Sequence, residues 1–538
     1  MCFLLLKAVL LSVNARYIHS SLAPWLLAEG TAHYSRFKHE VKVIETTIKQ
    51  ENSVIAEQTA ADSPDVVGIG AYIWNAAKLP ELLRLLRLRL PDAVFVLGGP
   101  ETSHNAEYWL GIGVDFVVRG EGERAFPQLL DALAEGDDEA LRSFCEGTLI
   151  AHLQSPVDPY SSEYFEALDG RIAYIEASRG CYNNCAYCLS AGEKVRFFSL
   201  EMIKDQIYKL SRSGAKTVKF IDRTFNSNAA RAYELLEYVI GLDTSCHFHF
   251  EAAPDLFDEQ TLTLLAAAPP GRIQIELGIQ SFNKRALEAV SRRSDLAKAE
   301  DNIRILTEMR NIHVHVSLIA GLPYETLSSF KNTFNRAHAL NPHMLQLGFL
   351  KLLHGSRLRS DAKELGIKYS DEPPYEIISS PWLSPADLDV LKQAESALEH
   401  TYNKARFLSL IEYVLSAEGL DRFSFYASLG KAIPNHAIPP NIYVQQIIDF
   451  CAGLPNSVGS KLNDCAIRDL LRSSKGKNIP RSLRAHGTQR KEAIRTAERF
   501  LGRVIDRDEA AVLSTGEIVF VDSNKRDPVT GLYELYSG

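Results

Sequence analysis

The sequence predicts an α/β protein in three consecutive parts. Short apolar strands alternate with amphipathic segments twice along the chain, first over residues 1–150 and again over 160–355. Helical patterns dominate residues 356–538. Regular alternation of strands and helices is typical of parallel sheets with helices on both faces. We therefore expect a doubly wound, Rossmann-like parallel sheet, then a second parallel strand–helix series, then a mainly helical domain.

The composition is typical of a water-soluble globular protein. Of the 538 residues, 46% are hydrophobic and 23% are charged, and the length suggests about three domains. No uncharged apolar run reaches about 18 residues, so no transmembrane helix is expected. The apolar start follows a strand pattern and lacks a convincing signal-peptide cleavage site, and clustered free thiols agree with a reducing compartment. We expect a cytoplasmic protein, and the net charge of −8 gives no general reason to expect nucleic acid.

Residues 1–150 contain five predicted strands, and the loops after them are rich in polar, aromatic and glycine residues. In open parallel sheets, ligands bind beyond the carboxyl ends of the strands, and glycine lets the backbone approach a flat ligand closely. Neither glycine-rich nucleotide motif, G-x-G-x-x-G or G-x-x-x-x-G-K-[ST], occurs in this part. The strands are predicted at 7–13, 41–46, 66–71, 93–97 and 116–119, with helices at 22–34, 53–61 and 79–90. The candidate ligand contacts are Ser12, Asn14, Tyr17, Tyr72, Trp74, Asn75, Gly98, Gly99, Gly120, Glu121, Gly122 and Glu123.

The strongest functional signal is a short cysteine-rich loop. Cys181, Cys185 and Cys188 follow a predicted strand with the spacing C-x3-C-x2-C. Three thiolates on one tight loop can hold an iron–sulfur cluster, and a four-iron cubane then keeps one iron without a protein ligand. A structural zinc site usually has four protein ligands, and no second cysteine pair occurs. The remaining cysteines are scattered singly at Cys2, Cys145, Cys246, Cys451 and Cys465. Zinc and a chance spacing of buried thiols remain the alternatives.

The cysteine spacing resembles that of the radical S-adenosylmethionine (SAM) superfamily, in which an aromatic residue such as Tyr187 often precedes the last cysteine. The resemblance implies a [4Fe-4S] cluster whose open iron chelates SAM, and reductive cleavage of SAM to a 5'-deoxyadenosyl radical. It also implies a partial (β/α)6 barrel at residues 160–355, with its chemistry at the carboxyl ends of the strands. The six strands are predicted at 172–177, 217–221, 247–251, 273–277, 314–319 and 344–350.

Several positions at these strand ends match the SAM-binding segments of that superfamily. Gln280 and Ser281 fit its E-x-G-x-Q-S segment, and Gly321 to Glu325 fits its G-x-P-x-E pattern near the adenine. Its G-G-E segment is not evident, because Asp222-Arg223-Thr224 occupies that place, and the ligand of the SAM amino group stays open. The implied SAM contacts are Asp222, Glu251, Glu276, Gln280, Ser281, Gly321, Leu322 and Pro323. A structural role is the alternative, for example an ion pair of Glu276 with Arg223 or Arg272.

The first part resembles the cobalamin-binding domain that precedes many radical SAM domains. The resemblance rests on a strand followed by Gly98-Gly99-Pro100, and on the later segment from Val117 to Glu123. The resemblance implies that the candidate ligand contacts of this part bind cobalamin. Many such domains carry D-x-H-x-x-G, whose histidine binds cobalt, but here Arg16 stands at the histidine position and His19 is out of register. The resemblance therefore implies cobalt without a protein histidine, shielded by Tyr72 or Trp74. Plain packing of these aromatic residues and loss of cobalamin binding remain alternatives.

The third part is predicted to be mainly helical and locally basic. Ser384 is expected to cap a helix that begins with Pro385. Helices are predicted at 387–404, 408–417 and 443–452, and a strand pair at 511–514 and 518–522. Residues 468–503 hold 11 Lys or Arg against 3 Asp or Glu, a net charge of +8. Such a run is usually a solvated or packed helix face, and contact with nucleic acid is the alternative. This part resembles an uncharacterised domain that accompanies cobalamin-type radical SAM proteins. The resemblance implies that it closes the open side of the barrel.

Together, these resemblances imply a cobalamin-dependent radical SAM enzyme, most simply a methyltransferase that acts on an unactivated carbon. Tyr182, Tyr187 and Tyr324 are candidate radical terminators or proton acceptors. One alternative is a rearrangement or cyclisation with the same cofactors, and another is a non-catalytic iron–sulfur or cobalamin sensor that binds RNA. The expected partners are a small-molecule or natural-product-like substrate and a one-electron donor of the flavodoxin or ferredoxin type. Contact with a membrane is not expected, and nucleic acid is a minor alternative.

Overall fold

The computed structural model describes residues 5–145, 157–433 and 440–538, which fall into two compact units. Unit 1 comprises Met1–Ala252, Val290–Arg292 and Leu350–Ile378, and unit 2 comprises Ala253–Ala289, Arg293–Phe349 and Ser379–Gly538. The domain boundaries predicted near residues 150 and 355 stay predictions. The first of them lies outside the described residues.

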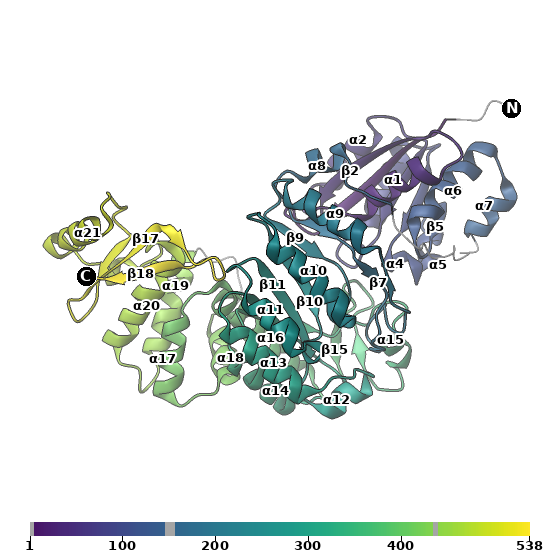
Figure 1. Ribbon diagram of the computed structural model, residues 1–538. Coiled ribbons are helices and arrows are strands. Elements are labelled where there is room, and N and C mark those ends of the chain that lie inside the picture. Colours follow the sequence, from purple (N-terminus) through teal and green to yellow (C-terminus); the bar gives the residue numbers. More distant parts are fainter. Residues whose placement is uncertain (1–4, 146–156, 434–439) are drawn as a thin grey trace. The chain divides into compact units, whose positions relative to one another are not determined.

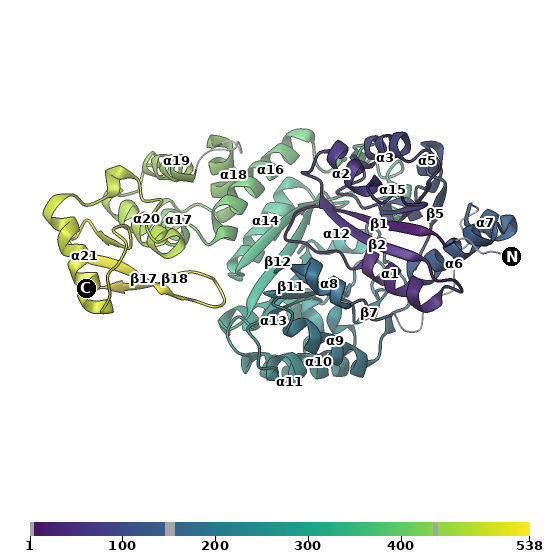
Figure 2. The ribbon, with the colours of Figure 1, turned by 90° about the horizontal axis from the view of Figure 1, so that it is seen from above.

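Unit 1 begins with the expected parallel sheet (Figures 1 and 2). Its five strands lie in the order β2-β1-β3-β4-β5 and all pair in parallel. They are β1 (Lys7–Asn14), β2 (Glu40–Thr47), β3 (Val66–Gly70), β4 (Val94–Gly98) and β5 (Phe116–Val118). The helices are α1 (Ala23–Tyr34), α2 (Asn52–Ala60), α3 (Leu79–Arg89), α4 (Pro100–Ser103), α5 (Ala106–Gly111), α6 (Gly122–Glu135) and α7 (Asp138–Cys145). The strand order reverses between β1 and β3, where sheets of this order bind their ligand.

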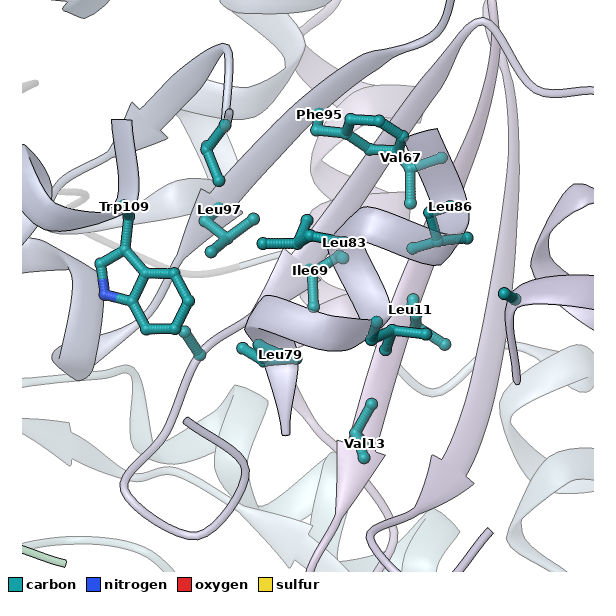
Figure 3. Close-up of a cluster of buried hydrophobic side chains, with 14 of the residues drawn as sticks. Leu11, Val13, Val67, Ile69, Leu79, Leu83, Leu86, Phe95, Leu97 and Trp109 are labelled. Carbon is teal, nitrogen blue, oxygen red and sulfur yellow. The ribbon is translucent and has the colours of Figure 1, made fainter. Parts of the chain in front are cut away.

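Hydrophobic side chains cover both faces of this sheet. Successive strand residues point to opposite faces, so Leu10 and Leu11 of β1 enter different cores. Figure 3 shows the first core, in which strand residues meet α3 and Trp109 of α5. The second core packs Phe126 and Leu129 of α6 against the other face. Because full burial of one such side chain contributes about 1.5–3 kcal/mol, two covered faces hold the strand ends in fixed positions.

The rest of unit 1 carries the cysteine loop. Three parallel strands lie in the order β10-β9-β6. A short antiparallel pair, β7 with β8, brackets the loop. The elements are α8 (Ser162–Leu168), β6 (Ala173–Ile175), β7 (Ser178–Arg179), β8 (Arg196–Phe197), α9 (Leu200–Ser211), β9 (Thr217–Phe220), the 3-10 turn η1 (Phe225–Ser227), α10 (Ala229–Gly241), β10 (His247–Ala252), α15 (Arg357–Asp361) and β14 (Lys368–Tyr369), with β15 (Ile377–Ser379) at the boundary with unit 2.

Unit 2 contains three further parallel strands in the order β11-β12-β13. The elements of this portion are η2 (Pro254–Leu256), α11 (Glu259–Ala266), β11 (Ile273–Gln280), α12 (Lys284–Ala289), α13 (Leu296–Glu308), β12 (His313–Ala320), α14 (Leu327–Ala339) and β13 (Met344–Phe349). All six strands predicted for residues 160–355 are therefore present, three in each unit. The prediction of parallel strand–helix units in this part is confirmed.

The C-terminal portion of unit 2 is mainly helical, as predicted. Ser384 caps α16 in a capping box with Asp387. The elements are α16 (Pro385–His400), η3 (Tyr402–Lys404), α17 (Leu408–Glu418), α18 (Arg422–Ala432), α19 (Pro440–Ala452), α20 (Gly459–Ser474), η4 (Arg481–Leu483), α21 (Gly487–Leu501), β16 (Ala510–Val512), β17 (Ile518–Arg526) and β18 (Tyr533–Ser537). The strand β18 was not predicted, because its five residues follow a polar turn and show little apolar alternation. Among the described residues, no helix is long and apolar enough to cross a membrane.

Gly99→Ala should destabilise the protein more than Gly113→Ala. Both glycines have a φ of +100°, so either substitution costs about 1–2 kcal/mol in backbone strain. At Gly99 the new Cβ would also lie 2.7 Å from the carbonyl oxygen of Ala71, whereas around Gly113 no described atom lies within 4 Å. We expect a further loss of about 1–3 kcal/mol for Gly99→Ala, visible as a larger drop of Tm. Equal drops of Tm would contradict the close approach.

Candidate functional site

The cysteine loop folds back on itself through backbone hydrogen bonds. The N–H of Cys181 donates to the carbonyl of Glu193 at 3.1 Å, and the N–H of Cys188 donates to the carbonyl of Cys185 at 3.0 Å. Gly180 precedes the loop with a φ of +92°, and a Cβ there would lie 2.6 Å from the carbonyl oxygen of Lys194. The tight return places the three thiols on one short segment directly after β6 and β7.

The three thiols are free and largely buried. Cys181 and Cys185 are 8% and 4% exposed, and no disulfide joins any of them. The Sγ of Cys181 lies 3.6 Å from the Oγ1 of Thr224, which follows β9. Three clustered thiols without a disulfide fit the ligand set of an iron–sulfur cluster. They do not by themselves supply the fourth ligand of a structural zinc site.

Arg292 is the buried cation beside these thiols. Its Nη1 lies 3.7 Å from the Sγ of Cys185. Burial alone would lower the pKa of Arg292, but the neighbouring Tyr187 and Cys185 raise it above its ordinary value. A buried guanidinium offsets the negative charge of thiolates, because opposite charges interact strongly away from water. Arg292 is held near the loop by the hydrogen bond from the Ala186 N–H to the Val290 carbonyl, at 2.8 Å. The sequence did not indicate this residue, because it lies more than one hundred positions after the loop.

Arg179 links the cysteine loop to the loop after β5. Its guanidinium pairs with Glu176 at 2.8 Å and with Glu121 at 3.2 Å, and it also pairs with Glu123. Arg196 of β8 forms a second ion pair with Glu121. Burial alone would lower the pKa of Arg179, but the carboxylates of Glu176 and Glu123 raise it above its ordinary value. Glu121 and Glu123, predicted as ligand contacts, therefore hold the two loops together.

The loop after β1 uses its polar groups for internal contacts. Asn14 donates to a carboxylate oxygen of Glu45 at 3.0 Å and accepts from Ser21 at 2.6 Å. Ser12 contacts both Asn14 and Ser21. Arg171, next to β6, pairs with the same Glu45 at 2.8 Å, with both side chains less than a tenth exposed. Ser12 and Asn14 thus lie at the carboxyl end of β1, as predicted, within a buried polar network.

Tyr17 and His19 of the same loop reach toward the segment around β6. The Tyr17 hydroxyl donates to Asp169 at 3.0 Å, although the ring is 65% exposed. The Nδ1 of His19 lies 2.6 Å from the Tyr174 hydroxyl. Burial, with the charges of Arg16 and Lys219, lowers the pKa of His19. His19 is thus engaged by Tyr174 of β6.

The aromatic pair after β3 forms a flat platform. Tyr72 and Trp74 stack with ring centroids 4.3 Å apart and an interplanar angle of 6°. The indole N–H of Trp74 donates to the Val13 carbonyl, and 45% of the residue is exposed. Asn75 is buried and fixes the turn, because its side chain accepts from the Tyr72 N–H and donates to the Gly70 carbonyl. The exposed indole therefore lies at the strand-order reversal between β1 and β3.

The four glycines predicted as ligand contacts lie at two turns from a strand into a helix. Gly98 ends β4, and Gly99 precedes α4 with its backbone against Ala71. Gly120 has a φ of +77°, and Gly122 begins α6 against Leu27. Each pair turns the chain sharply from a strand into a helix at the carboxyl edge of the sheet, which leaves backbone rather than side chain at that edge.

Asp222 and Glu251, two predicted SAM contacts, already have partners within unit 1. The carboxylate of Asp222 accepts from the Ala177 N–H at 2.9 Å and from the Ser178 hydroxyl at 2.5 Å. Burial raises the pKa of Asp222 to about 7. Glu251 of β10 pairs with Lys219 of β9 at 3.0 Å. Asp222 therefore fastens the segment that leads into the cysteine loop, and Glu251 is neutralised by a neighbouring strand.

The predicted SAM contacts of unit 2 lie at the carboxyl ends of β11 and β12, except Glu276, which lies in the middle of β11. Glu276 accepts from Ser317 at 3.0 Å. Gln280 has a φ of +71° at a register shift between β11 and β12. A non-glycine residue in this conformation is strained, which is common at binding sites. Gly321, Leu322 and Pro323 continue from β12 toward Tyr324, whose ring packs on Trp382 at 4.5 Å and under the Arg285 guanidinium at 4.2 Å.

Ser281 and Glu325 form a buried hydrogen-bonded group with Thr333. The carboxylate of Glu325 accepts from Ser281 at 2.5 Å and from Thr333 at 3.3 Å. Its second oxygen has no partner among the described residues. Burial raises the pKa of Glu325 to about 7, against the lowering effect of the two hydroxyls. Ser281 therefore supports the loop after β12 from within.

Three segments of the chain match known families. Residues 10–130 match the B12 binding domain, residues 175–337 the radical SAM superfamily, and residues 363–510 a protein family of unknown function, DUF4080. The chain is 26% identical to "Uncharacterized methyltransferase PH0819" of Pyrococcus horikoshii, over 60% of this chain and 75% of the relative. It is 26% identical to the cobalamin-dependent radical SAM methyltransferase TokK of Streptomyces tokunonensis, over 50% of this chain and 44% of TokK. It thus spans less than half of TokK.

Solved structures share the fold. TsrM from Kitasatospora setae, a radical SAM methyltransferase with cobalamin and a [4Fe-4S] cluster bound, matches with a TM-score of 0.56 at 20% identity. The match covers 71% of this chain and 81% of TsrM. The cobalamin-dependent SAM radical enzyme OxsB matches with a TM-score of 0.58 at 13% identity, over 93% of this chain and 81% of OxsB. These likenesses confirm the predicted α/β architecture.

Arg179→Gln should destabilise unit 1 strongly, because it leaves Glu123 and Glu176 without their cation, while Glu121 keeps Arg196. Loss of one partner from a buried ion pair costs about 3–5 kcal/mol. Lys42→Gln is the matched control, since the pair of Lys42 with Asp62 is about half exposed on both sides and is worth at most about 1 kcal/mol. Thermal denaturation should show a much larger drop of Tm for Arg179→Gln. A small, equal drop for both variants would show that the network does not hold the loops.

Glu325→Gln should flatten the pH dependence of stability. The pKa of Glu325 is about 7 in the folded protein against an ordinary value of 4.5, so the folded state retains a proton that the unfolded chain releases between these values. Stability from this group therefore falls as pH rises from about 4.5 to 7, by up to about 3 kcal/mol, and is constant above that. Glutamine cannot titrate, so the change in Tm between pH 5 and pH 8 should shrink. A slope equal to that of the exposed control Glu492→Gln would contradict the assignment.

Proposed function

We propose that this chain, which carries B12-binding, radical SAM and DUF4080 domains, is a cobalamin-dependent radical SAM methyltransferase that acts on an unactivated carbon. The observation that carries the proposal lies within unit 1. The loop with three free, clustered thiols is tied through Arg179 to Glu121 and Glu123, on the ligand-binding edge of the cobalamin-type sheet. One ion-pair network thus connects the two candidate cofactor sites.

The residues of the cysteine loop would hold the cluster. Cys181, Cys185 and Cys188 supply three thiolates, and Arg292 stabilises their negative charge and provides a cation for the carboxylate of SAM. When bound, these cofactors supply a 5'-deoxyadenosyl radical and a cobalt-bound methyl group. Such cofactors are needed because a carbon without an acidic proton cannot be deprotonated and alkylated by side chains alone. The chain's own part is to bind, orient and exclude water.

The platform after β3 would face cobalamin. The exposed Trp74 indole, stacked on Tyr72, would offer an apolar surface to the corrin ring. The glycine turns at Gly98–Gly99 and Gly120–Gly122 leave room for a large flat ligand at the same sheet edge. The relative TokK is named cobalamin-dependent, and the TsrM structure holds cobalamin, which supports this assignment.

Three tyrosines are proposed to quench or move a radical or proton. Tyr182 follows the first cysteine and Tyr187 precedes the last. Tyr182 is 45% exposed, whereas the hydroxyl of the half-buried Tyr187 is buried. Tyr324 is held in a left-handed conformation, with φ +63°, after the Gly321 turn. We propose the exposed Tyr182 as the strongest of these three candidates, because a proton or radical acceptor must reach the substrate or solvent. The SAM contacts proposed in unit 2 are Glu276, Gln280, Ser281, Gly321, Leu322 and Pro323.

The partners follow from the same chemistry. A small-molecule, natural-product-like substrate and a one-electron donor of the flavodoxin or ferredoxin type are proposed, with a cytoplasmic location. The support is a cluster that requires reduction and free thiols that persist in a reducing compartment. TokK and the hopanoid C-3 methylase of Methylococcus capsulatus, the latter 24% identical over 53% of this chain and 58% of the relative, are named as methylating enzymes.

The proposed function is tested by measuring both cofactors and the product. Protein purified without oxygen from cobalamin-fed cells should contain about four iron atoms and about one cobalt atom per chain. Reduced protein should form 5'-deoxyadenosine from SAM, and the product should gain one methylene in mass. A turnover product without that mass gain would replace methyl transfer by rearrangement or cyclisation. Absence of 5'-deoxyadenosine would exclude radical catalysis, and the non-catalytic sensor would then be the remaining interpretation.

Cys185→Ala should abolish iron incorporation and 5'-deoxyadenosine formation while cobalt content persists. The reason is that three thiolates are the fewest that hold a cubane with one open iron. Cys465→Ala is the control, because Cys465 is a single, partly exposed thiol of α20 and should retain full iron. Iron counts and visible spectra of both variants check this. Retention of a full cluster in Cys185→Ala would overturn the assignment of the cysteine loop.

A further inference from the structure

Unit 2 contains a groove that the proposed radical chemistry does not use. Its volume is about 700 Å³, within the range of small-molecule sites. It is lined by the end of α13, the turn between α14 and β13, the last turn of α20 and the turn after β17. These segments lie at the amino ends of β12 and β13. An eight-residue strand spans about 26 Å, so the groove lies far from the carboxyl strand ends with Gln280 and Gly321.

Two arginines in the groove form no ion pair within the described part of the chain, although the charge of Arg472 acts on Asp469 of the same helix. Arg310 follows α13 in a left-handed conformation, with φ +57°, and Arg472 lies in the last turn of α20. Within the described ranges, neither side chain forms an ion pair. Arg304, the third arginine of the groove, is engaged by Asp301 and Glu300. Two guanidinium groups from different elements thus converge on one groove.

Two acids near the groove have hydrogen-bond partners other than these arginines. The Asp527 carboxylate accepts from the backbone N–H groups of Val529 and Thr530 and from the Thr530 hydroxyl. Asp469, one turn before Arg472, accepts from two N–H groups at the start of α17. Glu308 is exposed and is the one lining acid without a hydrogen bond or ion pair in the described part of the chain. With Arg304, Arg310 and Arg472 against Glu308 and Asp527, the lining carries a formal excess of one positive charge.

Neutral donors complete the lining. The Nδ1 of His343 accepts from the Val314 N–H at 3.1 Å, so the neutral ring carries its proton on Nε2. Burial lowers the pKa of His343, against the opposite effect of Asp527, which favours that neutral form. The side chain of Asn341 adds an amide, whereas the Thr530 hydroxyl already donates to Asp527. Guanidinium groups with neutral N–H and O–H donors are the usual partners of phosphate oxygens.

We propose that this groove binds a phosphate-bearing small molecule through Arg310 and Arg472. The groove is a defined pocket of small-molecule size, and it favours a phosphate ester over the extended backbone of a nucleic acid. The proposal is independent of the radical chemistry, since no groove residue belongs to either candidate cofactor site.

The test titrates the full chain with inorganic pyrophosphate and with ADP by calorimetry. Arg310→Gln and Arg472→Gln should each weaken binding at least tenfold, and the double variant should show no saturable binding. Arg495→Gln, on the exposed face of α21, is the control and should bind like the unchanged protein. Formation of 5'-deoxyadenosine by Arg310→Gln should be unchanged, which separates this proposal from the proposed function.

Three results would overturn the proposal. The first is absence of saturable binding of either probe. The second is equal binding by the unchanged protein and the double variant, which would indicate adventitious anion binding only. The third is an equal loss for Arg495→Gln, which would indicate a diffuse basic surface such as RNA uses. Arg310 is exposed, so its variant folds even if Arg472→Gln lowers Tm, and protection of 304–310 from hydrogen exchange by pyrophosphate gives a second measurement.

Discussion

The guanidinium group of Arg179 is the contact on which the chemistry of unit 1 depends. It is adjacent to Gly180 and Cys181, and it faces Glu121, Glu123 and Glu176 with little exposure to water. Three carboxylates at close range repel one another, and burial makes that repulsion larger. Arg179 pairs with all three of them, and Arg196 adds a second cation at Glu121. The cysteine loop and the loop after β5 are therefore joined by a buried ion-pair network centred on Arg179.

A similar junction lies at the other edge of the same sheet. Glu45 of β2 accepts from Asn14 and from Trp25 and pairs with Arg171 beside β6. Arg171 also donates to the carbonyls of Leu168 and Ala167. A buried ion pair contributes little net free energy, but it disfavours other arrangements because a misplaced partner leaves a buried charge. Two such junctions, on different strands, restrict how the first sheet can meet the strands that follow.

The sequence alone predicted most strands but few of the long-range contacts. Apolar runs and periodicity are local, so the five strands of the first sheet and the six later strands were found, as was the cap at Ser384. The cysteine loop was found because its three thiols are adjacent in sequence. Arg292 was missed because its partner Cys185 is 107 positions away, and no pattern around Arg292 marks it. Glu121 and Glu123 were read as ligand contacts because loop position cannot distinguish a residue that binds a ligand from one that binds another loop.

Whether a loop residue binds a ligand or another loop also decides how a cobalt ion would be held. The segment that aligns with D-x-H-x-x-G contains His19, but its Nδ1 is engaged by Tyr174, and its backbone bridges to Ile172 beside β6. Asn14 is bound to Glu45, and Tyr17 to Asp169. The polar groups of this loop thus serve the junction between two parts of unit 1, and moving His19 to a ligand would break it. The Trp74 indole, half exposed and stacked on Tyr72, takes no part in that junction. The architecture therefore favours a corrin ring covered by an aromatic surface over one anchored by a histidine.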